Sequence, residues 1–169
     1  LKKRGRDRDD SRFLIVSTPA QGYVYPGTMA CAQVWEFRPR CPHCGELVRL
    51  SSDNVDIPQD ATAEDVKHGR CRVAIVPACC GVEWSDHDRM IAYHQGDWVC
   101  IKGEDLENPE TVGMHLSAYP LPNIPLKEIA EKIVAARTGG ETEKKALANG
   151  YDCVDYEEER IGQIDEEIG

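Results

Sequence analysis

Apolar residues between positions 126 and 134 recur with the period of an α-helix, at i, i+3, i+4, i+7 and i+8. The residues on this face are Leu126, Ile129, Ala130, Ile133 and Val134. Pro125 suits the first turn of a helix, and Gly139 marks its end. The pattern predicts an amphipathic helix whose apolar face packs into a core rather than against a partner.

Short apolar or alternating runs predict the strands. Residues 12–16 read as a buried strand that stops before Pro19, because proline has no N–H to donate within a sheet. Residues 34–38 alternate, and residues 46–50 are expected to return beside them as the second arm of a hairpin. Residues 72–76 are β-branched and apolar, and are expected to form a further strand.

Two capping patterns predict short helices. Thr62 is followed three residues later by Asp65, which is typical of a helix start, and predicts a helix over residues 62–68. Ser85, with acidic residues in the next turn, begins another helix that ends at Gly96.

The remaining segments have weaker patterns. Residues 20–33 are expected to be irregular, residues 114–119 extended, and residues 141–148 a short helix. Trp84 and Trp98 are expected to pack in a small core.

The clearest chemical signal is a pair of cysteine-rich turns. Residues 41–45 read Cys-Pro-His-Cys-Gly, and residues 78–81, about 35 positions later, read Ala-Cys-Cys-Gly. Zn²⁺ in structural sites takes four ligands, usually two from each of two distant turns. The proposed ligands are Cys41, Cys44, Cys79 and Cys80.

The second turn departs from the usual Cys-x-x-Cys spacing, because Pro77 stands where its first cysteine is expected. Adjacent cysteines can both reach one ion only if the local backbone permits it. The alternatives for the fourth ligand are Cys71, His43 and His87. A redox dithiol at Cys41 and Cys44 is a further interpretation, but such a motif should open a helix, whereas this one lies between two predicted strands.

Composition limits the class of protein. The 169 residues carry a net charge of −10, which argues against a surface that binds nucleic acid throughout. Charge is uneven: residues 1–12 hold six basic side chains against three acidic ones, and residues 151–169 hold eight carboxylates against one arginine. Both ends are predicted to be solvated arms.

The eight cysteines occur in a chain with neither a signal peptide nor an apolar run of membrane length, so we expect them to be reduced rather than paired as disulfides. The first residue is leucine rather than methionine, and we expect the chain to be a piece of a longer protein.

No catalytic constellation is recognisable. The sequence contains neither a Gly-Lys-Ser/Thr phosphate loop nor a nucleophile triad. His115 is expected to be hydrogen-bonded in the core rather than catalytic, because no partner can be named for it. One hypothesis is therefore a free-standing zinc-ribbon module that binds nucleic acid, favoured by the basic arm and opposed by the overall acidity.

Several motifs occur in the same order in large terminase subunits of the lambda type, the motors that package DNA into the heads of tailed phages. They are Ser17-Thr18-Pro19, residues 41–45, Cys80-Gly81 with Met90, Gly96-Asp97-Trp98, and residues 113–119 leading into a helix and Asn149. The chain resembles this family over about residues 12 to 158.

The resemblance implies the functional context. Members of the family have an N-terminal ATPase followed by a metal-dependent endonuclease, and Ser17 and Thr18 would belong to the segment that couples nucleotide state to movement. The full-length protein would use ATP and Mg²⁺. Its partners would be double-stranded DNA, the small terminase subunit and the portal, without a membrane, in the cytoplasm of a bacterial host cell.

The expected fold is α+β, with small zinc-ribbon-like β-hairpins and flanking helices, preceded by an edge of an α/β ATPase sheet. Four regions are expected: residues 1–33, a basic arm and the end of an ATPase-like region; 34–100, a zinc-ribbon-like domain; 101–150, a connector with the amphipathic helix; and 151–169, an acidic tail leading towards a nuclease domain.

Overall fold

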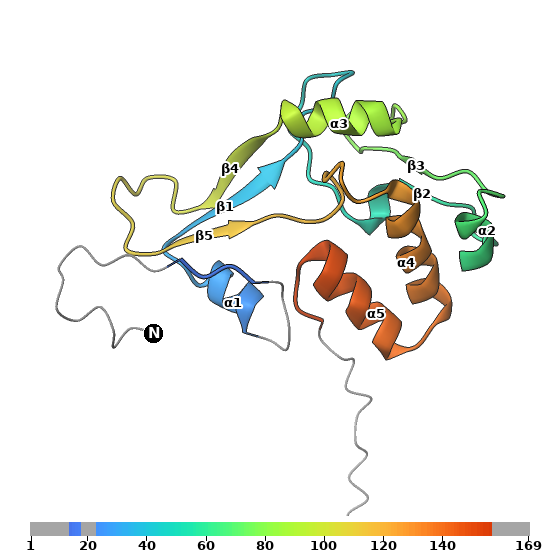
Figure 1. Ribbon diagram of the computed structural model, residues 1–169. Helices are drawn as coiled ribbons and strands as arrows, with labels where there is room; N and C mark the ends of the chain where they lie inside the picture. The colour runs from blue at the N-terminus through green and yellow to red at the C-terminus, as the bar shows by residue number, and fades with distance from the viewer. Residues whose placement is uncertain (1–13, 18–22, 157–169) are drawn as a thin grey trace, which may run out of the picture.

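The computed structural model describes residues 14–17 and 23–156, which form an α+β fold (Figure 1). The helices are α1 (Val24–Met29), α2 (Ala63–Lys67), α3 (Asp86–His94), α4 (Leu126–Thr138) and α5 (Glu141–Leu147). The strands are β1 (Gln33–Arg38), β2 (Val55–Asp56), β3 (Ala74–Ile75), β4 (Asp97–Lys102) and β5 (Val112–His115). A 3₁₀ turn, η2 (Ser52–Asn54), and a π-helical turn, η3 (Ala148–Asp152), complete these elements. The predicted α+β class is confirmed.

β1 is the central strand of a three-stranded mixed sheet with the order β4-β1-β5 (Figure 1). It runs antiparallel to β4, with Phe37 opposite Trp98, and parallel to β5, with Trp35 opposite Met114. The rings of Phe37 and Trp98 meet edge to face, with centroids 5.5 Å apart. Trp98 therefore packs on the sheet, whereas Trp84 is buried in the main hydrophobic cluster.

The hairpin expected between residues 34–38 and 46–50 does not form, and this prediction was wrong. Backbone pairing of the return segment is limited to an isolated bridge between Arg40 and Leu47, although the Arg49 side chain reaches back to Glu36 of β1. Both edges of β1 are occupied by β4 and β5, which lie more than 55 residues later in the chain.

The further strand expected over residues 72–76 is short. Within residues 72–76 only Ala74–Ile75 form a strand, β3, which pairs antiparallel with β2. Trp84, just beyond the second cysteine turn, bridges to Ile75. The second turn is therefore anchored by a narrow ladder.

Residues 14–16 are not a buried strand, which corrects the prediction for residues 12–16 as far as the structure describes them. Leu14, Ile15 and Val16 are 89%, 72% and 84% exposed and have no regular structure. A strand needs a neighbour to satisfy its backbone groups, and no strand of the described ranges pairs with these residues. Residues 12 and 13 lie outside the described residues.

Helix α1 occupies a stretch expected to be irregular. Its sequence contains Pro26 and Gly27, which led to that prediction. The Thr28 hydroxyl donates to the carbonyl of Val24, and the helix packs against β5. A Cβ at Gly113 of β5 would lie 2.4 Å from the Thr28 carbonyl oxygen, so only glycine permits this approach.

Helices α2 and α3 begin as predicted. The Thr62 hydroxyl accepts a hydrogen bond from the Asp65 backbone N–H, and Ser85 accepts one from Asp88 in the same way. Each aspartate accepts in return from the N–H of its capping residue, completing a capping box. The expected helices over residues 62–68 and from Ser85 are confirmed.

Helix α4 carries the predicted apolar face and supplies much of the core. The buried cluster also contains Cys41 of the first cysteine turn, Trp84 beside the second, and residues of β2 and α2. The core therefore extends from α4 to the cysteine turns and supports both. None of the helices within the described ranges is long and apolar enough to cross a membrane.

Candidate metal centre

The two cysteine turns share one backbone hydrogen-bond pattern. The Gly45 N–H donates to the Cys41 carbonyl oxygen over 2.9 Å, and the Gly81 N–H donates to the Pro77 carbonyl oxygen over 3.0 Å. Gly45 and Gly81 have φ angles of +81° and +68°, which glycine adopts without a steric penalty. Pro77 thus occupies, in the second turn, the place that Cys41 occupies in the first.

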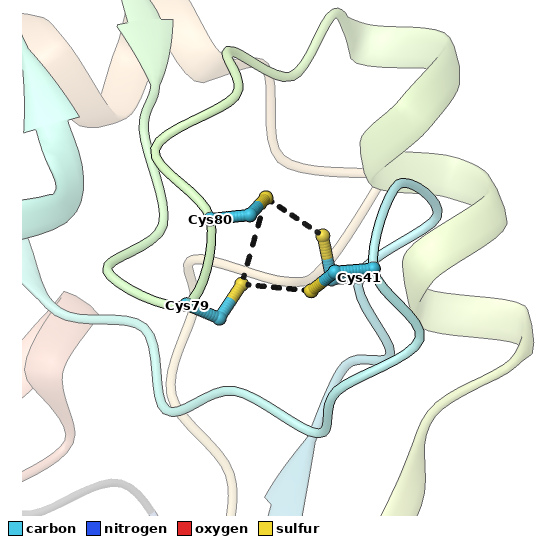
Figure 2. A group of neighbouring side chains, drawn as sticks. Cys41, Cys79 and Cys80 are labelled. Atoms are coloured by element: carbon cyan, nitrogen blue, oxygen red, sulfur yellow. Dashed lines mark hydrogen bonds between the residues drawn. The ribbon is translucent and has the colours of Figure 1, made fainter.

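Pro77 has no thiol, and Cys79 supplies the second sulfur atom of this turn instead. It stands two positions after Pro77, where the first turn has His43. Its Sγ lies 3.4 Å from that of Cys44, in the opposite turn. The Cys80 Sγ lies 3.7 Å from that of Cys41 and 3.9 Å from that of Cys79. Dashed lines mark these two contacts in Figure 2.

The spacing of the sulfur atoms suits a tetrahedral ion. All four lie within 4.8 Å of one another. A zinc ion with Zn–S bonds of about 2.3 Å would hold its sulfurs about 3.8 Å apart along each edge of the tetrahedron. The distances of 3.4, 3.7 and 3.9 Å lie around this value. The four clustered cysteines could therefore bind a metal such as zinc.

Charge within the cluster also favours a cation. Burial raises the pKa of the Cys41 thiol, but backbone N–H groups of Cys44 and His43, together with neighbouring thiols, outweigh burial and lower the pKa to about 6. Burial and the adjacent thiols raise the pKa of Cys79. Four thiols at this distance cannot all ionise without a positive charge between them, which a divalent metal supplies.

Arg40 ties the first turn to the end of α3, a role that sequence reasoning missed. Its guanidinium donates to the Gly45 carbonyl oxygen over 2.8 Å and to that of Gln95 over 3.3 Å. Its backbone N–H donates to the Ala92 carbonyl oxygen. Arginine beside a cysteine turn has no distinctive spacing, so only the structure identifies this contact.

The alternative fourth ligands lie elsewhere. Cys71 is half-buried and packs against the hydrophobic cluster. His43 is exposed, with its Nε2 4.0 Å from a carboxylate oxygen of Asp88, and His87 is exposed. None of the three belongs to the group of clustered sulfur atoms.

The other residues singled out from the sequence are placed as follows. Ser17 is exposed and outside any regular element, and Thr18 lies outside the described residues. His115 is buried, and its Nε2 lies 3.0 Å from the Cys153 carbonyl oxygen. Its Nδ1 lies 3.8 Å from a carboxylate oxygen of Glu36. The expected hydrogen-bonded core position of His115 is confirmed.

Comparison with known proteins gives the family. No curated protein and no solved structure matches the chain. Residues 1–98 match the family described as phage terminase large subunit gpA, ATPase domain. The match covers more than half of the 169 residues and includes both cysteine turns. The chain therefore belongs to the phage terminase large subunit gpA family and contains part of its ATPase domain.

Proposed function

We propose that the chain is a segment of a DNA-packaging terminase large subunit in which a structural zinc ion joins two distant turns. The ligands would be the four clustered thiolates, Cys41, Cys44, Cys79 and Cys80. The observation that carries this proposal is the set of sulfur–sulfur distances, which match the edges of a zinc–thiolate tetrahedron.

The zinc would be structural rather than catalytic. Four protein thiolates complete the coordination of the ion and leave no position for water or substrate. The second turn is otherwise held by a two-residue strand, one bridge and the Arg72–Glu83 ion pair, so a metal link would add most to the stability of this turn. The zinc would thereby fix the turns against the end of α3.

The first experiment is elemental analysis of the purified chain with a thiol titration before and after chelation. We expect one zinc per chain and four thiols that the reagent of the thiol titration modifies only after chelation. Cys79→Ser should lose zinc, whereas Cys71→Ser, the matched control, should keep it. Zinc retained by Cys79→Ser and lost by Cys71→Ser would refute this ligand set.

The full-length protein would hydrolyse ATP with Mg²⁺ to translocate double-stranded DNA, and would cut the DNA with a separate nuclease domain. Its partners would be the small terminase subunit and the portal, in the cytoplasm of the bacterial host. The family match over residues 1–98 supports this proposal.

Ser17 and Thr18 would couple ATP hydrolysis to movement in that protein. Substitution of both by alanine should preserve ATP binding and abolish DNA translocation.

Full-length protein that neither hydrolyses ATP nor cuts DNA would refute the motor function. A DNA gel shift by the isolated chain that weakens steeply with salt would instead favour the free-standing nucleic-acid-binding module.

A further inference from the structure

The sulfur cluster is accessible from solvent along most of its border. Cys41 is 1% exposed and belongs to the core. Cys44, Cys79 and Cys80 are all exposed residues. A small oxidant in solution can therefore approach three of the four cysteines without any opening of the fold.

The geometry selects one pair of cysteines for oxidation. The Cys44 and Cys79 Sγ atoms are 3.4 Å apart, closer than the Cys41–Cys80 contact of 3.7 Å. A disulfide requires an S–S distance of about 2.05 Å, so these atoms need to approach by about 1.4 Å. Cys79 and Cys80 are adjacent, and their sulfur atoms are 3.9 Å apart. A disulfide between neighbouring residues closes a tight ring with a distorted peptide, so the pair across the two turns is favoured.

We propose that the cluster is a thiol-oxidation site, at which a hydroperoxide converts Cys44 and Cys79 into a disulfide and the zinc ion is released. This inference rests on the proposed zinc site. The device would make the metal link between the two turns sensitive to peroxide.

The chemistry balances with hydrogen peroxide as the oxidant. The thiolate of one cysteine attacks a peroxide oxygen, forming a sulfenic acid and releasing hydroxide. The thiolate of the other cysteine then attacks the sulfenic sulfur, forms the S–S bond and expels a second hydroxide. The two sulfurs lose two electrons in total, the peroxide gains them, and two protons convert the hydroxides into water.

Loss of these two thiolates leaves the ion with Cys41 and Cys80 alone. Two ligands hold zinc far more weakly than four, so the ion dissociates. The new disulfide still joins the two turns, and the buried cluster beneath them does not depend on the exposed sulfurs. A dithiol reductant followed by zinc should restore the original site.

The experiment treats the zinc-loaded chain with hydrogen peroxide in the presence of a chromophoric zinc chelator, followed by peptide mapping under non-reducing conditions. We expect one disulfide, between Cys44 and Cys79, and two lost thiols for each zinc released. The control carries serine at three cysteines outside the cluster, Cys31, Cys71 and Cys100. It should bind and release zinc at the wild-type rate.

The outcomes separate this inference from the proposed function. A chain that never binds zinc would refute the zinc site and, with it, the oxidation step. A zinc-loaded chain that keeps its metal in excess peroxide would refute only the oxidation step. The oxidation step alone would also be refuted if zinc leaves while the mapped disulfide joins other cysteines, or if peroxide no longer releases zinc from the triple-serine control.

Discussion

Glu36 should make the stability of this chain fall steeply in acid. Its side chain is buried on β1, with Oε2 2.9 Å from the Arg38 Nε and Oε1 3.1 Å from the Arg49 Nε. Burial by itself raises the pKa of this carboxyl group. The contacts with His115, Arg38 and Arg49 outweigh burial and lower the pKa from 4.5 to about 2.

The magnitude follows from this change in pKa. Because one pKa unit is worth about 1.4 kcal/mol, the ionised Glu36 contributes about 3 kcal/mol to the free energy of unfolding near neutral pH. The unfolded chain binds this proton more tightly, so the contribution is complete above the unfolded pKa of about 4.5 and is lost as pH falls towards 2. At pH 3 about 1.4 kcal/mol should remain.

The assay is urea unfolding of the wild type and Glu36→Gln between pH 7 and pH 2.5. The variant should be less stable by about 3 kcal/mol at pH 7, and the difference should shrink in acid. Acid also protonates the cysteine thiolates, but both proteins share that loss, so it cancels in the difference. Glu107→Gln, on an exposed loop, removes the same charge as a control and should stay within about 0.5 kcal/mol of the wild type. A difference between Glu36→Gln and wild type that does not change with pH would refute the reasoning.

Three further predictions concern the core, a helix cap and the metal. Ile129→Ala removes a side chain on α4 that is 0% exposed, and should lower the free energy of unfolding in urea by about 2 to 5 kcal/mol. Lys127→Ala, on the exposed face of the same helix, should lower it by less than about 0.5 kcal/mol. Equal losses of stability would place α4 outside the core. Thr62→Ala removes the acceptor for the Asp65 N–H and should lower the free energy of unfolding by about 1 kcal/mol. Thr62→Ser keeps a hydroxyl acceptor and should restore most of that stability. If Thr62→Ser is as unstable as Thr62→Ala, the loss comes from packing rather than from the helix cap. Chelation should lower the melting temperature of the zinc-loaded chain and added zinc should restore it, and a melting curve insensitive to both would contradict a structural metal.

The sequence predicted the local structure correctly where a few neighbouring residues decide it. The caps at Thr62 and Ser85 are local hydrogen bonds, so both helices begin as predicted. The apolar period of α4 depends only on its own residues, and the helix forms over Leu126–Thr138. The spacing of the cysteine turns indicated which thiols would gather, and the structure brings those four sulfur atoms together.

Only the tertiary structure decided the rest, because it depends on contacts between distant segments. β1 pairs with β4 and β5 rather than with its neighbour along the chain, since the better strand partners lie far away in sequence. Glu36 is buried beside Arg38 of its own strand and Arg49 of the segment after the first cysteine turn, and the contact with Arg49 has no signature in the local sequence. Cys79, rather than Cys71, joins the sulfur cluster because the second turn repeats the backbone of the first, with proline in place of its first cysteine. Local patterns thus determined helices α2, α3 and α4 and the candidate ligands, and long-range packing determined the sheet and the way the two turns meet.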